Sequence, residues 1–268
     1  MIAFPHAKIN LGLSVVSKRP DGFHNLETIF YPIPLHDVLE IVPSGEFHFF
    51  PGGLNIPGDA ADNLVLRAFH LLKSQYPKIS SLGIYLYKAI PLGAGLGGGS
   101  SDGAFIIQLL NQYFNLHISP VELTGFALQL GSDCPFFMQS EACFALGRGE
   151  ILEPLKLDLS AYSFLLIHSE IRIPTNWAYS KVKPSAPQYD LKESISKPVE
   201  TWPHIIKNDF EEAVFETYPL LKKIKDQLYS SGALFASMTG SGSTIYGIFP
   251  KKKLPSLIVE NASQTMIQ

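Results

Sequence analysis

Polar and apolar residues alternate along positions 8 to 16, near the start of the chain. Lys8 and Asn10 fall on one face of this segment, whereas Ile9 and Leu11 fall on the other. A period of two residues predicts a half-buried β-strand. This strand would carry a lysine and an asparagine side by side on its polar face.

A second predicted strand, at positions 82 to 90, leads directly into a glycine-rich segment, and a helix is expected over positions 100 to 114. The segment between them reads Pro91-Leu92-Gly93-Ala94-Gly95-Leu96-Gly97-Gly98-Gly99-Ser100-Ser101. Glycines let several backbone N–H groups point inward, and a helix start adds free N–H groups and the positive end of its dipole. The order of strand, glycine loop and helix start therefore predicts a phosphate site.

The rest of the first half contains shorter patterns. Short strands are expected at positions 39 to 42 and 46 to 50, followed by a Pro-Gly-Gly turn. A helix over positions 62 to 75 would be capped by Asp62. The run from Ser119 to Glu122 is a capping box with proline at the first helical position, and it predicts a helix that ends at Gly131.

A second series of predicted strands and helices begins after Gly149. The elements expected there are a strand at 162 to 168, a Pro- and Ser-rich surface excursion at 183 to 204, a helix at 208 to 230 broken at Pro219, and a strand at 244 to 249. Strands and helices mix without strict βαβ alternation, which favours an α+β fold. A soft boundary near residue 152 would divide the chain into two lobes, residues 1–152 and 153–268.

Composition narrows the classes of function. The 268 residues are 46% hydrophobic and 17% charged, with a formal net charge of -3. Such a balance does not favour nucleic acid or an anionic membrane as partner, because both attract basic surfaces. Neither a signal peptide nor an apolar run of about 20 residues occurs, so we expect a soluble, cytoplasmic protein with a small-molecule substrate. The sequence carries no signal of oligomeric state, and Cys134 and Cys143 have neither zinc-ligand nor disulfide spacing.

Three known nucleotide motifs fit the glycine loop poorly. A P-loop needs a lysine after its spacer, and this loop has none. Gly93, Gly95 and Gly98 satisfy the dinucleotide spacing G-x-G-x-x-G, but the nearest acidic candidate, Glu122, lies in a capping box. A protein kinase would need a later His-Arg-Asp loop, which is absent from the sequence.

The loop instead resembles the Pro-x-Gly-x-Gly-Leu-Gly-Gly-Gly-Ser-Ser motif of the GHMP kinases (galactose, homoserine, mevalonate and phosphomevalonate kinases). Residues 5 to 11, Pro-His-Ala-Lys-Ile-Asn-Leu, are similar to the first motif of that family, and residues 238 to 244, Met-Thr-Gly-Ser-Gly-Ser-Thr, to its third. The resemblance implies a two-lobed fold with the active site in the cleft between the lobes, an ATP-binding N-terminal lobe, and ATP as the phosphate donor.

Further segments resemble one branch of the family. These segments are residues 18 to 26, which contain Asp-Gly-Phe-His, residues 131 to 137, the Ile173-Pro174-Thr175 run and the Asp62-Asn63-Leu64 helix start. The resemblance implies that the acceptor is the 2-hydroxyl of a cytidylylated methylerythritol, in non-mevalonate isoprenoid precursor synthesis. The substrate-binding residues expected on this basis are Asn10, Phe23, His24, Thr175, Tyr179, Gly240 and Ser241. Phe23 stands where this branch often has tyrosine, and Ser132 where alanine is common.

Phosphoryl transfer to an alcohol needs a group that accepts the hydroxyl proton and a cation that stabilises the developing alkoxide. Asp133, in a loop after the predicted helix, and Lys8, on the polar face of the first strand, are the candidates for these two catalytic roles. No protein-built metal site is expected; Mg²⁺ would arrive with ATP and touch the Ser101 hydroxyl. Phe23 and Tyr179, or Trp177 in place of Tyr179, would stack on the cytosine, and His24 would supply hydrogen bonds.

Other functions remain open at this level. A sister kinase of the family with another alcohol substrate should lack the Asp-Gly-Phe-His segment. A non-catalytic ATP-binding regulator on the same fold would need neither Lys8 nor Asp133, yet both are present. A dinucleotide oxidoreductase would reveal itself by NADH fluorescence.

Overall fold

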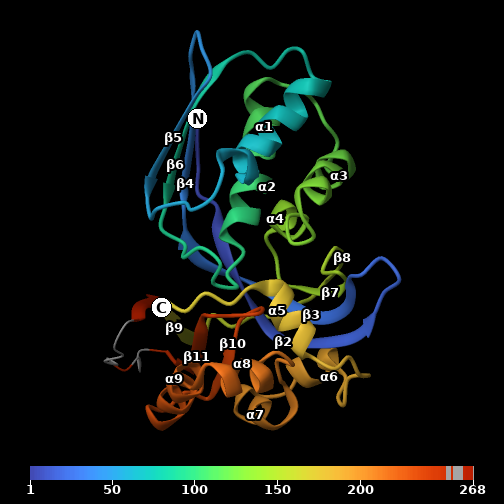
Figure 1. The fold of residues 1–268 in the computed structure, drawn as a ribbon, viewed down its shortest axis with the longest axis vertical. Coiled ribbons are helices and arrows are strands. Elements are labelled where there is room, and N and C mark those ends of the chain that lie inside the picture. The colour runs from blue at the N-terminus through green and yellow to red at the C-terminus, as the bar shows by residue number, and fades with distance from the viewer. Residues whose placement is uncertain (252–254, 256–261, 268) are drawn as a thin grey trace. The chain divides into compact units, whose positions relative to one another are not determined.

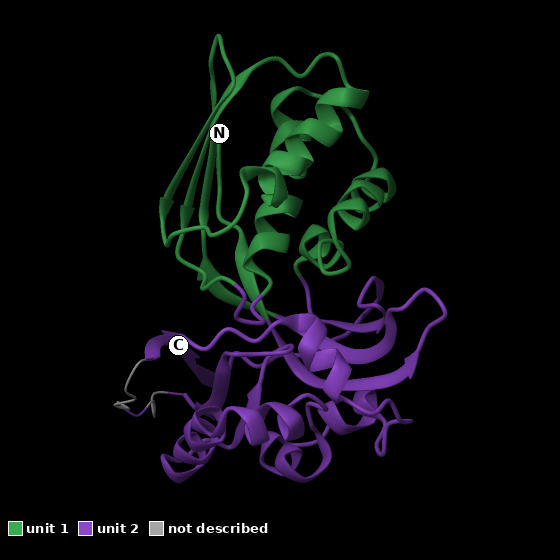
Figure 2. Ribbon diagram, viewed as in Figure 1, with its two compact units in different colours: residues 1–8, 32–92, 97–140 green, residues 9–31, 93–96, 141–268 purple. Residues whose placement is uncertain are grey.

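A computed structural model describes residues 1–251, 255 and 262–267. They form two compact units, shown in different colours in Figure 2. Unit 1 contains Met1–Lys8, Pro32–Leu92 and Gly97–Ser140, and unit 2 contains Ile9–Tyr31, Gly93–Leu96 and Glu141–Gln268. The units interleave along the chain because strands β2 (His6–Lys18) and β3 (His24–His36) each run from one unit to the other. The last change of unit follows Ser140; a division into two lobes at residue 152 stays a prediction.

Unit 1 contains a four-stranded sheet with three longer helices on one face (Figure 1). The strands, in spatial order, are β1 (Ile2–Ala3), β4 (Val38–Pro43), β6 (Leu82–Lys88) and β5 (His48–Gly53). Strand β6 pairs antiparallel with β4 and parallel with β5. The helical elements are the 3₁₀ turn η1 (Ala60–Asp62), α1 (Leu64–Gln75), α2 (Gly98–Tyr113), α3 (Pro120–Leu130) and α4 (Phe136–Gln139).

The ends of these elements follow from local chemistry. Helix α3 has the expected capping box, in which the Ser119 hydroxyl accepts from the N–H of Glu122. The expected cap of α1 was wrong: Asn63, not Asp62, accepts from the N–H of Val65, and Asp62 belongs to η1. The expected Pro-Gly-Gly turn was also wrong, because these residues complete the edge strand β5, which is paired with β6.

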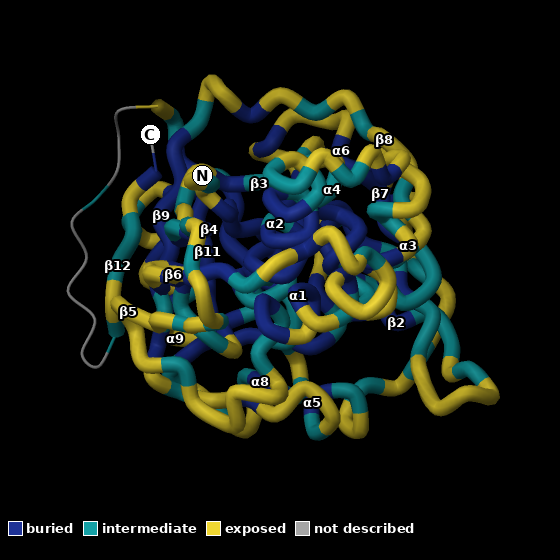
Figure 3. The backbone as a smooth tube through the Cα atoms, turned by 90° about the horizontal axis from the view of Figure 1, so that it is seen from above, coloured by how far each residue is buried: buried dark blue, intermediate teal, exposed yellow. Residues whose placement is uncertain are grey.

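The core of unit 1 lies between the sheet and the helices. Its fully buried side chains include Phe69 of α1, Ile106 and Leu110 of α2, and Ile84 of β6. Figure 3 shows buried positions as dark blue stretches along these elements. The apolar stripes of α1 and α2 therefore face the sheet, and the start of α2 is held by its buried neighbours on β6.

Unit 2 contains the antiparallel sheet β10 (Phe235–Met238), β11 (Ile245–Pro250), β9 (Tyr162–Ser169) and β12 (Ala262–Ile267), in that order. The other sheet has the order β2, β3, β7 (Cys143–Gly147), β8 (Ile151–Pro154). The remaining helical elements are α5 (Thr175–Lys181), α6 (Leu191–Ile195), η2 (Val199–Thr201), α7 (Trp202–Ile205), α8 (Glu211–Thr217) and α9 (Pro219–Ser230). Leu221, Ile224 and Leu228 of α9 are fully buried in the core of unit 2.

Most expectations for this half are confirmed. The helix expected over 208 to 230 is broken at Pro219 into α8 and α9, because proline starts a new helix and cannot donate to the previous turn. The expected surface excursion is not structureless, since α6, η2 and α7 lie within it and Trp202 is buried. Strand β12, which follows β11 and pairs antiparallel with β9, was not expected from the sequence. In the described part of the chain, no helix has the length and apolar character to cross a membrane.

Candidate active site

The start of helix α2 has the geometry of an anion site. Gly97 precedes the helix with φ +72°, and no side chain caps the N-terminus. A β-carbon on Gly97 would lie 2.8 Å from Phe137 and 3.2 Å from the Lys8 side chain, whereas one on Gly99 would meet no atom within 4 Å. The first backbone N–H groups and the dipole of α2 are thus available to an anion beside the buried Lys8 stem.

The loop also contains two buried apolar residues and two serines, which differ in how accessible they are to a ligand. Ala94 and Leu96 are buried and anchor the loop, so only their backbone is available to a ligand. Ser100 is partly exposed. Ser101, proposed from the sequence to touch Mg²⁺, is fully buried, and its hydroxyl has no partner in the described residues. A magnesium contact at Ser101 would require movement of the first turn of α2, which makes Ser100 the more accessible hydroxyl.

Lys8 and Asp133 lie next to each other in unit 1, although 125 positions separate them in the sequence. Lys8 Nζ is 3.7 Å from Asp133 Oδ2. Asp133 lies in the turn between α3 and α4, where its carbonyl accepts from the N–H of Phe136. Burial lowers the pKa of Lys8, and the charge of Asp133 opposes this change. The pair combines a possible proton acceptor with a buried cation, which is the combination that phosphoryl transfer to an alcohol requires.

Asn10 is the centre of a buried network in unit 2. Its Nδ2 donates to Thr28 Oγ1 at 2.9 Å, and Thr239 Oγ1 is 3.2 Å from its Oδ1. The backbone N–H of Asn10 donates to the same Thr239 oxygen, and Tyr246 donates to the Asn10 carbonyl. Thr239 Oγ1 is also 3.0 Å from the carbonyl of Gly95. Asn10 therefore links the first motif, the glycine loop and the third motif.

The third motif forms the turn between β10 and β11. Gly240 has φ +56°, and Asn208 Nδ2 donates to the carbonyls of both Met238 and Gly240 at 2.8 Å. Ser241 follows and is partly exposed. One buried side-chain amide thus holds the turn in place, and Gly240 and Ser241 are its partly exposed residues.

The expected aromatic residues gather in unit 2. His24, the first residue of β3, stacks on Tyr179 of α5 with 5.0 Å between ring centroids, and Tyr179 packs edge-on against Phe210. Trp177 instead contacts Tyr218. Burial lowers the pKa of His24, with Lys18 acting in the same direction, so the neutral ring can donate at one nitrogen and accept at the other.

Phe23 and Thr175, the other two residues expected to bind substrate in this part of the chain, are exposed. Phe23 is 52% exposed, and the Arg148 guanidinium lies 4.9 Å from its ring centroid. Thr175 is exposed at the first position of α5. Arg148 was missed from the sequence because it follows a β7 strand that carries no motif. Of the two aromatics considered for the second stacking position, Tyr179 is the one beside His24.

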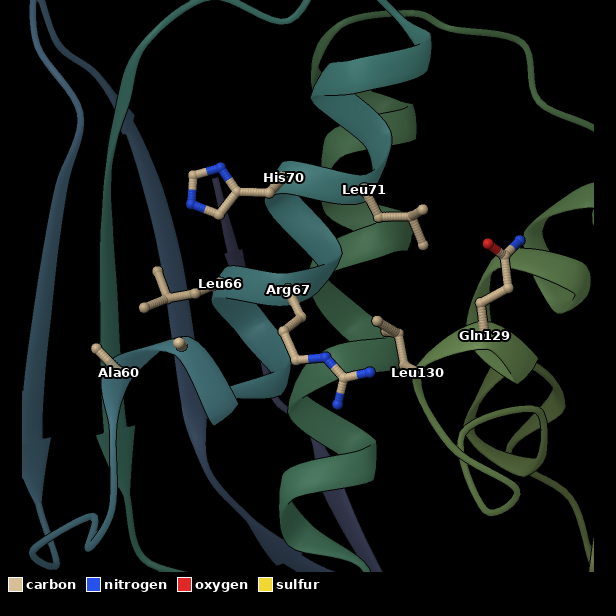
Figure 4. Close-up of a pocket in the computed structure, with 8 residues that line it drawn as sticks. Ala60, Leu66, Arg67, His70, Leu71, Gln129 and Leu130 are labelled. Carbon is tan, nitrogen blue, oxygen red and sulfur yellow. The ribbon is translucent and has the colours of Figure 1, made fainter.

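A separate cavity of about 580 Å³ lies in unit 1 on α1 and the end of α3 (Figure 4). Arg67, His70, Leu71 and Leu130 are among the residues that line it. Figure 4 shows the Arg67 side chain extending from α1 toward the Leu130 end of α3. None of the site residues expected from the sequence lines this cavity.

Sequence reasoning also missed a buried cluster of Asp37, Lys88 and Asp102 at the end of β6. The sequence could have indicated Asp102, because it directly follows the two serines of the loop motif. It could not have indicated Lys88, which is simply the last residue of an alternating strand. In the described residues, no group of three or more His, Cys, Asp or Glu side chains is placed to hold a metal ion.

Comparison with known proteins places these features in a family. Residues 63–141 match the model of the GHMP kinases N terminal domain, and residues 192–268 match the model described as GHMP kinases C terminal. The chain belongs to the GHMP kinase family. The expected family and the α+β fold class are thereby confirmed.

Individual relatives carry more specific names than the family models. A 4-diphosphocytidyl-2-C-methyl-D-erythritol kinase of Parabacteroides distasonis is 50% identical, covering 94% of this chain and 92% of its own length. The enzyme of that name from Bacteroides fragilis (strain ATCC 25285) is 47% identical, covering 98% and 97%. A crystal structure of 4-(cytidine 5'-diphospho)-2C-methyl-D-erythritol kinase has a TM-score of 0.77 at 32% identity, covering 92% of this chain and 90% of that one. A mevalonate kinase structure, with a TM-score of 0.65 at 16% identity, shares the fold alone.

Proposed function

We propose that this chain transfers the γ-phosphate of ATP to the 2-hydroxyl of 4-diphosphocytidyl-2-C-methyl-D-erythritol, in non-mevalonate isoprenoid precursor synthesis. The observation that carries the chemistry is the Lys8–Asp133 pair, whose Lys8 stem lies beside Gly97 at the start of α2. The choice of substrate is supported by relatives of that name that match at 40–50% identity along almost the whole chain.

The proposed reaction uses the residues of unit 1 as follows. The first N–H groups of α2 bind the phosphates of ATP. Asp133 takes the proton of the attacking hydroxyl while the new oxygen–phosphorus bond forms and the bond between the γ-phosphorus and the bridging oxygen of ADP breaks. The Lys8 ammonium stabilises the negative charge on the attacking and transferring oxygens. Mg²⁺ would arrive with ATP, its main ligands being the phosphates, and would neutralise part of their charge.

Residues of unit 2 suit recognition of a cytidine. Tyr179 and Phe23 offer aromatic faces, and stacking on an aromatic face contributes about 1–3 kcal/mol per base without selecting among bases. Selection would come from hydrogen bonds, for which neutral His24 has both a donor and an acceptor. In the structure the ring of His24 stacks on Tyr179. Binding of the nucleobase would therefore require these two rings to separate, or the base to stack on their outer faces.

An ADP-release assay that offers the cytidylylated sugar alcohol, mevalonate and homoserine side by side tests the proposal. The expected result is magnesium-dependent release with the first compound and background release with the other two. Preference for mevalonate or homoserine would assign the chain to a sister activity. Binding of ATP without release of ADP for any of the three would point to a non-catalytic nucleotide-binding protein.

A further inference from the structure

Arg148 lies over the ring of Phe23, one of the two aromatic residues on which the proposed recognition of a cytidine depends. Both residues belong to unit 2, where β3 pairs with β7 and Leu26 lies opposite Gly147. Because the two strands are antiparallel, the turn after Gly147 runs beside the turn that precedes β3. The guanidinium carbon of Arg148 lies 4.9 Å from the centroid of the Phe23 ring, a distance at which a cation is attracted to the ring face.

The turn between β7 and β8 holds Arg148 in this position. Gly147 and Gly149 have φ values of +69° and +106°, which glycine adopts without steric cost. The N–H of Gly149 donates to the Leu146 carbonyl at 3.0 Å and closes the turn. The Glu150 carboxylate accepts from the backbone N–H of Arg148 and also from its Nε, the latter at 3.2 Å. One carboxylate therefore fixes both the backbone and the side chain of Arg148.

The backbone of Phe23 is also fixed, but its ring is not buried. Its carbonyl accepts from the N–H of Arg19 at 2.8 Å, and its N–H donates to Asp21 Oδ1 at 3.1 Å. The residue is nevertheless 52% exposed. An exposed aromatic side chain can change rotamer, and it loses this freedom when a base stacks on it. A contact that orders the ring before the ligand arrives lowers that cost.

The charges around Arg148 favour an effect on the ring over direct contact with a phosphate group. Arg148 Nε is paired with Glu150 Oε1, and Arg19 is paired with Asp21 at 2.9 Å. These four side chains together carry no net charge, so they exert little attraction on an anion. The planar guanidinium, in contrast, is well suited to stacking on an aromatic face.

We propose that Arg148 is a positioning residue for the cytidine substrate. Its guanidinium holds the Phe23 ring in one orientation, so that the opposite face of the ring is presented to the nucleobase. Arg148 thus acts through Phe23 and does not touch the reacting atoms. This inference rests on the proposed function, because it requires that Phe23 contact the cytidine.

Arg148→Met tests the inference, because it keeps an unbranched apolar side chain and removes the cation. Calorimetric titration of the full chain with 4-diphosphocytidyl-2-C-methyl-D-erythritol should give a Kd about twofold to fivefold higher than that of the wild type, as expected for loss of an exposed cation–π contact. In the ADP-release assay, the KM of this substrate should rise by the same factor, whereas kcat and the KM of ATP should not change. A role in stability alone would lower the melting temperature without this split.

Lys73→Met is the matched control. It removes a cation that lies 5.4 Å from the ring centroid of Phe69, in α1 of unit 1. The Phe69 ring is buried, so no ligand can stack on it. This variant loses the same charge and the same kind of contact, and its Kd and KM values should match those of the wild type.

A double-mutant cycle shows whether Arg148 acts through the ring. Phe23→Leu keeps an apolar side chain and removes the aromatic face, so it should weaken substrate binding by itself. Arg148→Met should then cause no further loss in the Phe23→Leu background, because the contact that it removes is already absent.

Two outcomes would overturn the inference. One is an unchanged Kd in Arg148→Met while Phe23→Leu binds the substrate more weakly; Phe23 would then meet the nucleobase without help from Arg148, and the proposed recognition would stand. The other is an equal loss from Arg148→Met in the wild-type and Phe23→Leu backgrounds, which would mean that Arg148 contacts the substrate directly. Failure of the proposed recognition gives a different result: an unchanged Kd in Phe23→Leu would show that the ring does not meet the cytidine, and the inference would fall with it.

Discussion

Asp133→Asn is the substitution that tests the proposed chemistry most directly. The amide has the shape of the carboxylate but cannot accept the hydroxyl proton at neutral pH. Loss of a general base lowers the rate by about 10²- to 10⁴-fold, so kcat should fall by that factor. ATP binding should change little, because Asp133 lies in the turn before α4 and not in the glycine loop.

The structure also predicts an electrostatic effect of this substitution. The charges of Lys8 and Asp133 are 3.7 Å apart. At about 4 Å, their attraction is about 1 kcal/mol in water and about 4 kcal/mol at an effective dielectric constant of 20. The Asp133 side chain is 37% exposed, so the lower part of this range applies. Burial already lowers the pKa of Lys8, and losing the carboxylate charge would lower it further.

The pH profile of kcat measures this effect. Lys8 is charged below its pKa, so the wild-type rate should fall on the alkaline side as Lys8 loses its proton. In Asp133→Asn the remaining activity should fall at lower pH. The assay is ADP release at saturating substrates from pH 6 to 10, with Asp226→Asn as a control that should match the wild type. A near-normal kcat in Asp133→Asn would place the base elsewhere, and an unmoved alkaline limb would mean that the two charges are not coupled.

Further expectations concern binding and stability. Gly99→Val should abolish ATP binding in calorimetry while the protein stays folded, because its side chain would enter open space at the helix start; Gly125→Val, at an equally open helical glycine of α3, should bind normally, and equal affinities in both would refute the site. Tyr179→Ala should raise the KM of the cytidine substrate by about 5- to 100-fold and leave ATP affinity unchanged; equal losses for both ligands would indicate a core role. Asp102 has a folded-state pKa of about 8, above its unfolded value near 4, so the wild type loses stability as pH rises between these values; in differential scanning fluorimetry, the melting temperature of Asp102→Asn should gain on that of the wild type from pH 5 to 8, and a constant difference would contradict this. Asn208→Ala removes the donor to two carbonyls and the acceptor of one N–H group, which should lower the free energy of unfolding in urea by about 2–4 kcal/mol; a change below about 0.5 kcal/mol would show that these groups find other partners.

Local features of the chain could be predicted because they depend on neighbouring residues. The capping box at Ser119 and the break at Pro219 are both properties of a few adjacent side chains and the backbone between them. The glycine loop belongs to the same class, since the conformations of its glycines and the helix start that follows are set within about ten residues. Where two adjacent residues could both serve as a helix cap, the prediction was wrong by one residue: Asn63, not Asp62, caps α1.

The sequence by itself therefore determined the family, and it indicated the candidate phosphate loop, the candidate base and the candidate cation. Only the tertiary structure decided which of these residues meet. It placed Lys8 beside Asp133 in unit 1 and joined Asn10 to Thr239 across 229 positions in unit 2. It also buried Lys88 between two carboxylates, which no periodicity could indicate. The physical reason is that charge pairing and hydrogen bonding act through space. Their partners are chosen by strand pairing and helix packing, which bring distant parts of the chain together.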